Sequence, residues 1–428
     1  MNILDTYLKR VTSYIKSKEA RAFVVAELTQ HIKHAQQGWL NKGLTEDDAL
    51  QKAIREMGSP STLGESMNKI HKPKVDWFLI ALLVTVMVLS FFPVLTQTMY
   101  SSDLHLLLKR KAIFVVLGIV LAISMMFLDY RKLQKFGYVF FGIGTAILLL
   151  LSLFPTAYIS GQPLFMVGPL RIESMMAMPF YVISWASFFH NRINLFVCIG
   201  LFVTSSLLFV MNFQITSLLV YIALVAMLFW YSTCSKRIKL IVTGIGVSLG
   251  IGIVLWYVML YHTGAIKPYQ IERITAFFNP EEHTNGLGFL YMVLQNVISQ
   301  ASWIGASDSM AISESHTNFV LASVIQSYGL ILAIVLVVLL ALCTVRLLMI
   351  GLRVRDPYAR LLLVGSMTIF GAQFVYHVGM TFGYLPIVAM PMPFVSYGLM
   401  PTILGAFIVG IALSVWRRKS LYVVEKSM

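Results

Sequence analysis

The sequence predicts an all-α, polytopic membrane protein whose membrane part follows a small helical bundle. Hydrophobic residues make up 58% of the 428 residues and charged residues only 12%, whereas about 25% of the residues in a soluble domain are charged. The mean hydropathy is +0.77, and long apolar runs alternate with short polar connections. A helix needs roughly 20 apolar residues to cross about 30 Å of hydrocarbon. The runs therefore predict membrane spans and exclude a soluble enzyme fold beyond residue 76.

Residues 1–76 have an ordinary soluble composition, with 12 of the 33 basic and 9 of the 19 acidic residues. Apolar residues recur at three- and four-residue spacing from Leu4 to Ile15, which predicts one amphipathic helix. A Thr-x-x-Asp cap at Thr45 and a Gly-Ser-Pro break at Pro60 predict further helices. We expect a small helical bundle on the cytoplasmic side of the membrane.

About ten spans are expected in the second domain, residues 77–428. They lie at about 77–97, 112–128, 136–159, 175–189, 193–211, 215–233, 238–261, 319–349, 361–383 and 393–415. The segment 175–189 is short for a span, and 319–349 is long enough to tilt or to begin outside the bilayer. With both termini in the cytoplasm, 15 Lys and Arg residues fall in cytoplasmic connections and 6 in outer ones. This asymmetry agrees with the positive-inside rule.

The largest connection, at about 262–318, lies outside in this topology and is long enough to be a functional element. Its partly apolar stretch near 287–304 predicts a re-entrant or interfacial helix. No phosphate-binding loop, zinc helix or nucleophile elbow occurs in the sequence, and neither a metal-ligand cluster nor a Cys pairing pattern is present. The basic residues form no run long enough to indicate nucleic-acid binding.

Polar residues at the outer ends of the spans are the candidate functional groups. Arg110 and Arg273 suit an anion, because a guanidinium matches phosphate geometry with paired donors. Either side chain could instead snorkel to the interface. His316 and Gln373 could bind a ligand or serve only in helix packing.

Several separated motifs resemble those of the SEDS family of bacterial cell-wall proteins, the group of FtsW, RodA and SpoVE. The strongest is Gln373-Phe-Val-Tyr-His-Val-Gly-Met-Thr-Phe-Gly-Tyr-Leu-Pro386, continued by Pro391-Met-Pro-Phe-Val-Ser-Tyr-Gly398. Lys109-Arg110 before a span that ends in Asp129-Tyr130, Arg273-Ile-x-x-Phe-Phe-x-Pro280, and His316-Thr-Asn-Phe319 are also similar to family motifs. Separately, the stretch from Glu27 to Pro60 resembles the permease prefix module. That likeness implies a regulatory or partner-docking domain, or one that only supports folding or insertion.

The SEDS resemblance implies a multi-pass protein of the bacterial plasma membrane that acts on lipid II or another undecaprenyl-linked precursor, with a class B penicillin-binding protein as partner. The implied substrate-binding residues are Lys109, Arg110, Arg273, His316, Gln373, Ser396 and Tyr397. No cofactor is implied, although a divalent cation bound together with a pyrophosphate stays open.

Departures from the family pattern concern its acidic residues. Asn318 stands where the family has its catalytic Asp, and an amide cannot accept a proton as a general base. Gln326 and Gln214 likewise replace family acids. Glu314 or Asp308 could supply a relocated base.

Three hypotheses follow: a protein that binds lipid II without polymerising it, a lipid II polymerase that uses Glu314 or Asp308, and a transporter of lipid-linked precursors.

Overall fold

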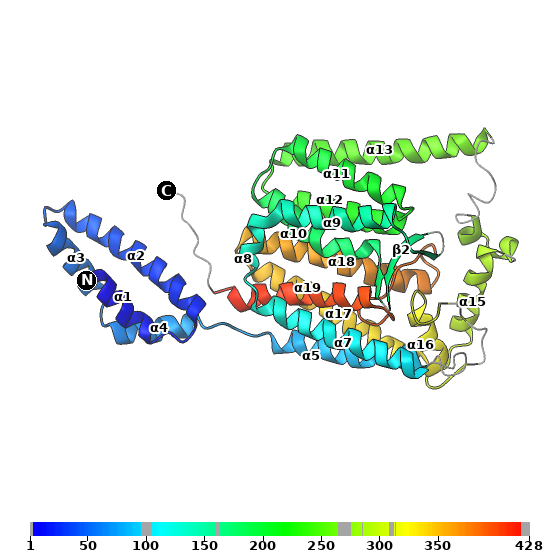
Figure 1. Cartoon of the computed structure of the whole chain (residues 1–428), viewed down its shortest axis with the longest axis horizontal. Coiled ribbons are helices and arrows are strands. Elements are labelled where there is room, and N and C mark those ends of the chain that lie inside the picture. The colour runs from blue at the N-terminus through cyan, green and yellow to red at the C-terminus, as the bar shows by residue number, and fades with distance from the viewer. Residues whose placement is uncertain are drawn as a thin grey trace. The chain divides into compact units, whose positions relative to one another are not determined.

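The computed structural model describes residues 3–95, 104–159, 162–168, 170–263, 275–284, 286–307, 312 and 314–420. The chain divides into two compact units, Met1–Asp76 together with Val415–Met428, and Trp77–Ser414. Figure 1 shows the elements of both.

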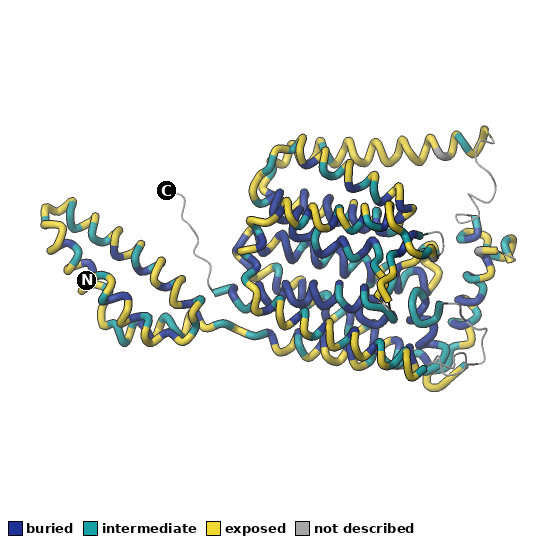
Figure 2. The backbone as a smooth tube through the Cα atoms, viewed as in Figure 1, coloured by how far each residue is buried: buried dark blue, intermediate teal, exposed yellow. Residues whose placement is uncertain are grey.

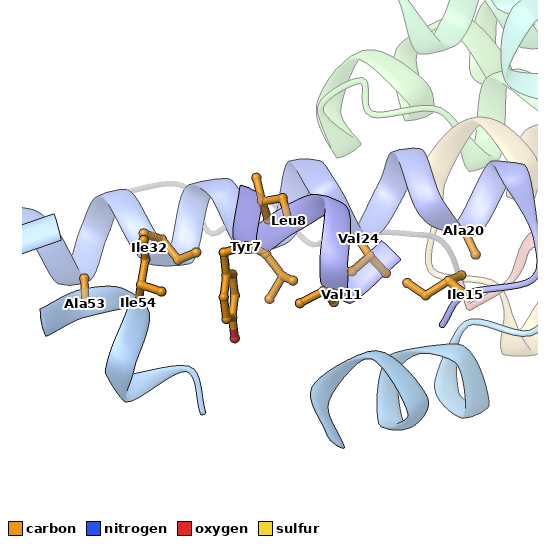
Figure 3. Packing of buried hydrophobic residues seen from close by; sticks show 10 residues of the cluster. Tyr7, Leu8, Val11, Ile15, Ala20, Val24, Ile32, Ala53 and Ile54 are labelled. Atoms are coloured by element: carbon orange, nitrogen blue, oxygen red, sulfur yellow. The ribbon is translucent and has the colours of Figure 1, made fainter. Parts of the chain in front are cut away.

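The first unit is the helical bundle that the sequence predicts. Its helices are α1 (Ile3–Ser13), α2 (Lys18–Leu40), α3 (Glu46–Glu56) and α4 (Pro60–Ile70). The hydroxyl of Thr45 accepts the backbone N–H of Asp48, so the predicted cap begins α3. Figure 3 shows the apolar core between the first three helices. Its residues are Tyr7, Leu8, Val11, Ile15, Ala20, Val24, Leu28, Ile32, Ala53 and Ile54.

Described residues that follow Ser414 complete this unit. The Arg418 guanidinium donates to Glu19 Oε1 at 2.8 Å. The Arg418 side chain is only 1% exposed, and a buried guanidinium needs such a partner. Two residues after Arg418, the carbonyl oxygen of Ser420 lies 2.8 Å from Nδ1 of His71. Sequence positions 399 residues apart are thus joined by the Arg418–Glu19 ion pair.

The second unit is a helical membrane domain. Its elements are α5 (Trp77–Leu89), α6 (Phe92–Leu95), α7 (Leu104–Phe127), α8 (Tyr130–Leu133), η2 (Gln134–Phe136), α9 (Gly137–Leu153), β1 (Ala157–Ile159), β2 (Gln162–Val167), β3 (Leu170–Ile172), η3 (Ser174–Ala177), α10 (Met178–His190), α11 (Leu195–Met211), α12 (Ile215–Tyr231), α13 (Lys236–His262), η4 (Pro280–His283), α15 (Leu287–Ser299), α16 (Val320–Tyr328), α17 (Leu330–Arg353), α18 (Pro357–Thr381) and α19 (Leu399–Arg418). Each of the ten predicted spans contains a helix. Among the described residues, six helices are long and apolar enough to cross a membrane.

The predicted short span proves to be the central helix of this unit. Of the 13 residues of α10, 11 are buried, and α10 packs against α9, α12 and α18. Pro179 lies in its first turn, where a missing N–H costs no intrahelical bond. In contrast, the side chains of α13 are mostly exposed, as Figure 2 shows.

Two features of the membrane unit differ from the sequence prediction. The connection before α10 holds a three-stranded antiparallel sheet in the order β1-β2-β3, where no strand was predicted. The predicted single span at 319–349 is two helices, because Gly329 breaks it with φ +89°. The carbonyls of Ser302 and Trp303 accept the N–H groups of Leu330 and Ile331, which satisfies two of the four orphan donors at the start of α17.

Gly329→Ala should destabilise the membrane unit. A Cβ at this position would lie 2.7 Å from the carbonyl oxygen of Trp303. The backbone of Gly329, with φ +89° and ψ 178°, also lies in a region that is essentially confined to Gly and costs another residue about 1–3 kcal/mol. We expect a lower thermal unfolding midpoint in detergent. Gly142→Ala is the control, since a Cβ there meets nothing within 4 Å. Equal midpoints for the two variants would contradict this account of the break.

Candidate functional site

The candidate site lies where the turn before α16 meets the segment before α19. Glu314 has φ +52°, and its carbonyl accepts the N–H groups of Thr317 at 3.0 Å and Phe319 at 3.3 Å. These bonds fold residues 314–319 into a compact turn. The turn presents the side chains of the His-Thr-Asn motif.

Hydrogen bonds join this turn to the segment before α19. The N–H of Tyr397 donates to the carbonyl of His316 at 2.7 Å, and the hydroxyl of Ser396 donates to the carbonyl of Thr317 at 2.7 Å. The rings of His316 and Tyr397 meet edge to face, with centroids 5.5 Å apart. Two motifs separated by about 80 residues in the sequence therefore form one structure.

Lys111 of α7 holds the segment before α19 from the other side. Its side chain is fully buried. The ammonium donates to the carbonyls of Phe394 at 3.0 Å, Val395 at 3.4 Å and Ser396 at 3.2 Å. A buried ammonium is costly unless its donors are satisfied, and this arrangement uses all three. Lys111 belongs to the basic cluster of residues 109–111, which opposes the positive-inside rule and for which a role other than orientation was expected, but this contact was not predicted.

Two arginines supply positive charge to the site. Burial raises the pKa of Tyr397, and the positive charges of Arg110 and Arg171 act in the opposite direction. Arg171, on β3, also lowers the pKa of His316, after the larger effect of burial and against the opposing effect of Glu314. The predicted Arg110 and also Arg171 thus act on Tyr397. Arg171 was not predicted as a site residue, because the sheet that carries it was not predicted.

The Asn318 amide lies against a carboxylate. Its Nδ2 donates a hydrogen bond to Glu314 Oε2. Both side chains are partly buried. A carboxylate oxygen of Glu314 is therefore hydrogen-bonded to the side chain of Asn318 in the His-Thr-Asn motif.

A second carboxyl group lies in the same charge environment. Burial raises the pKa of Glu173, while Arg171 opposes that shift. The following residue, Ser174, donates to the Gln214 amide oxygen at 2.9 Å. Gln214 thus takes part in a neutral hydrogen bond at the position where the resemblance implied an acid.

The remaining predicted residues lie apart from these contacts or outside the described residues. Lys109 is exposed, and Gln373 is buried within α18. Arg273 and Asp308 lie outside the described residues. No group of three or more His, Cys, Asp and Glu side chains that could hold a metal ion is found in the described part of the chain.

The fold and site define a multi-pass membrane protein with a polar site, built from the turn before α16 and the segment before α19, that holds both arginines and carboxylates. Residues 73–421 match the model of a family described as cell cycle proteins, FtsW, RodA and SpoVE. The chain belongs to this family, and it is a member of a group whose curated relatives are described as peptidoglycan glycosyltransferases.

Curated relatives are similar over different lengths. The probable peptidoglycan glycosyltransferase FtsW of Enterococcus hirae is 23% identical over 81% of this chain and 93% of its own length. The FtsW of Geobacter metallireducens is 32% identical over 39% of this chain, and the match spans 46% of that relative. MrdB of Escherichia coli K12, described as a peptidoglycan glycosyltransferase, is 29% identical over 34% of this chain and 40% of its own length.

Solved structures share the fold. One, described as "Structural coordination of polymerization and crosslinking by a peptidoglycan synthase complex", has a TM-score of 0.66 and 24% identity, and covers 81% of this chain and 98% of that chain. The Rod shape determining protein RodA of Thermus thermophilus has a TM-score of 0.57 and 19% identity, with 82% and 98% covered.

Lys111→Met should lower the thermal unfolding midpoint more than Lys109→Met does. The Met side chain keeps the length of the stem but leaves three buried carbonyls without their donor, and each unsatisfied group costs about 1–3 kcal/mol. Lys109 is exposed on the same helix, so its substitution is the control. Equal midpoints for both variants would contradict the holding role of Lys111.

The pKa of His316 predicts a pH dependence of stability. Because the folded state holds this pKa below the ordinary value, the unfolded chain binds more protons as the pH falls, and stability falls with it. Between pH 7.5 and 5.5, the thermal unfolding midpoint of wild type should fall by more than that of His316→Gln. His34→Gln removes an exposed histidine and should behave like wild type. An unchanged pH dependence in His316→Gln would refute the prediction.

Proposed function

We propose that this protein binds a lipid-linked peptidoglycan precursor at the outer face of the bacterial plasma membrane without polymerising it. The expected ligand is lipid II or another undecaprenyl-linked precursor. The observation that carries this proposal is the Asn318 amide at the centre of the His-Thr-Asn turn, hydrogen-bonded to Glu314. An amide cannot take a proton from an attacking hydroxyl, so the site lacks a general base at that position.

The charges of the site suit the pyrophosphate of such a ligand. Arg110 and Arg171 both act on Tyr397, and guanidinium groups are well matched to phosphate oxygens. Nδ1 of His316 is buried and has no hydrogen-bond partner among the described residues. Since buried polar atoms are nearly always paired, this nitrogen supports the binding of a polar ligand.

One observation favours a second candidate function, an active lipid II polymerase with Glu314 as the base. A general base must lie within hydrogen-bond reach of the proton that it accepts. Glu314 Oε2 lies within hydrogen-bond reach of the Asn318 amide. The Glu314 carboxylate is therefore close to the Asn318 side chain although four residues separate the two in the sequence. Asp308 lies outside the described residues and gains no such support.

A class B penicillin-binding protein is the proposed partner. The similar solved structure is described as a peptidoglycan synthase complex that coordinates polymerization and crosslinking, and the match covers 81% of this chain. We further propose that both termini face the cytoplasm, because the positive-inside count favours that orientation.

Glycan polymerisation separates the two candidates. The purified chain is incubated with lipid II, with and without a class B penicillin-binding protein, as wild type, Asn318→Asp and Glu314→Gln. A binding protein should yield no polymer as wild type, and polymer should appear in Asn318→Asp. Polymer from wild type would reject the binding proposal. If it then fell about 10²- to 10⁴-fold in Glu314→Gln, the usual effect of losing a general base, the second candidate would stand.

Two controls make this experiment specific. Glu281→Gln removes an exposed carboxylate of η4 outside the site and should leave any polymerisation unchanged. Lipid II binding is measured in parallel for Arg110→Gln and Arg171→Gln, with the exposed Arg355→Gln as control. The proposed ligand would be supported if wild type and Arg355→Gln bind lipid II and both site variants bind it less. Absence of lipid II binding by wild type would overturn the proposal.

A further inference from the structure

A cavity lies between the ends of three helices at the other end of the membrane unit, away from the candidate site. It is a groove of about 440 Å³ between α12, α17 and α18, within the range of roughly 300–1,000 Å³ that is usual for small-molecule sites. The lining residues are Met227 and Tyr231 of α12, Leu348, Gly351 and Leu352 of α17, and Arg360, Leu363, Val364, Met367 and Thr368 of α18. In Figure 1 these helix ends lie on the side of α8, whereas β2 and α16 lie at the opposite end.

The groove is apolar along most of its length and open to the outside of the helix bundle. Leu348 is 46% exposed, Leu352 74% and Met227 41%. Packing of α12 and α17 against α18 makes α18 the floor. Gly351 contributes no side chain to the wall. An exposed apolar groove beside membrane helices is suited to a hydrocarbon chain.

One cation closes the polar end of the groove. Arg360 is exposed, and one of its Nη atoms donates to the carbonyl of Val354 at 3.3 Å. No ion pair of Arg360 with a carboxylate is found in the described residues. The nearby Asp356 accepts hydrogen bonds from the hydroxyl of Tyr130 and the N–H of Tyr358. The guanidinium therefore keeps donors for an outside anion.

Further positive charge surrounds this end of the groove. Arg353 and Arg355 are exposed in the same connection. Lys239 donates to the carbonyls of Trp230 and Ser232, on either side of the groove residue Tyr231. The positive-inside count assigns these connections to the cytoplasmic side, where the lipid surface carries negative charge.

We propose that this groove binds an anionic phospholipid of the inner leaflet, with an acyl chain along the apolar wall and the phosphate on Arg360. Basic pockets between membrane helices on the cytoplasmic side are suited to acidic lipid head groups. The apolar wall matches an acyl chain and the Arg360 guanidinium matches a phosphate, so the groove favours a lipid over a water-soluble phosphate. The groove lies apart from the candidate site and does not depend on the proposed function.

Native mass spectrometry of the full chain in detergent tests this site. Wild type should retain phosphatidylglycerol about fivefold more than phosphatidylcholine with the same acyl chains, as one interfacial arginine would provide. Arg360→Gln should abolish this preference, and Lys135→Gln, which removes an exposed cation of η2 outside the groove lining, should keep it. Free glycerol phosphate should not be retained. A preference that survives in Arg360→Gln, or that is absent from wild type, would overturn the proposal, and retained glycerol phosphate would indicate an anion site that needs no lipid.

A matched pair of variants tests the apolar wall. A Cβ at Gly351 meets its nearest atoms, Leu363 Cβ and Met367 Sδ, only at 4.0 Å. Gly351→Ala should therefore leave lipid retention unchanged, whereas Gly351→Leu should fill the groove and reduce retention of both lipids. Both residues favour a helix more than Gly does, so α17 should form in each variant. Equal retention in the two variants would place the lipid outside the groove.

Discussion

The buried ammonium of Lys111 is the interaction on which the arrangement of the site depends. It gathers the carbonyls of residues 394–396, and the same segment then bonds through Ser396 and Tyr397 to the turn before α16. Within a membrane helix such a charge needs all its donors satisfied. The lysine thus links α7 to the segment before α19, and the hydrogen bonds of Ser396 and Tyr397 link that segment to the His-Thr-Asn turn.

The sequence predicted the helices well, because the requirement to satisfy every backbone group in lipid leaves apolar runs almost no alternative to a helix. It did not predict the sheet at 157–172, whose short strands lie in a connection without clear alternation. It also missed the break at Gly329. An isolated glycine in an apolar run is tolerated in many helices, and the carbonyls that force the break come from residues 302 and 303.

The candidate site was predictable only in part. The motif residues Glu314, His316, Ser396 and Tyr397 do come together, and their resemblance to a family pattern was the signal. Arg171 and Lys111 could not be recognised in this way, because their roles arise from the sheet and from burial. The hydrogen bond between Asn318 and Glu314 was also beyond the sequence, since four residues separate the two and only a turn with a left-handed Glu314 brings their side chains together.

The ion pair between Glu19 and Arg418 has a consequence for synthesis of the protein. The apolar core of the amino-terminal bundle uses only residues near the start of the chain, so it can form as soon as they leave the ribosome. Glu19 receives its partner only after the last helix has been made, on the order of tens of seconds later at the usual elongation rate. Throughout insertion, Glu19 therefore lacks the cation that it pairs with in the folded chain, and the bundle gains this ion pair only once α19 has been completed.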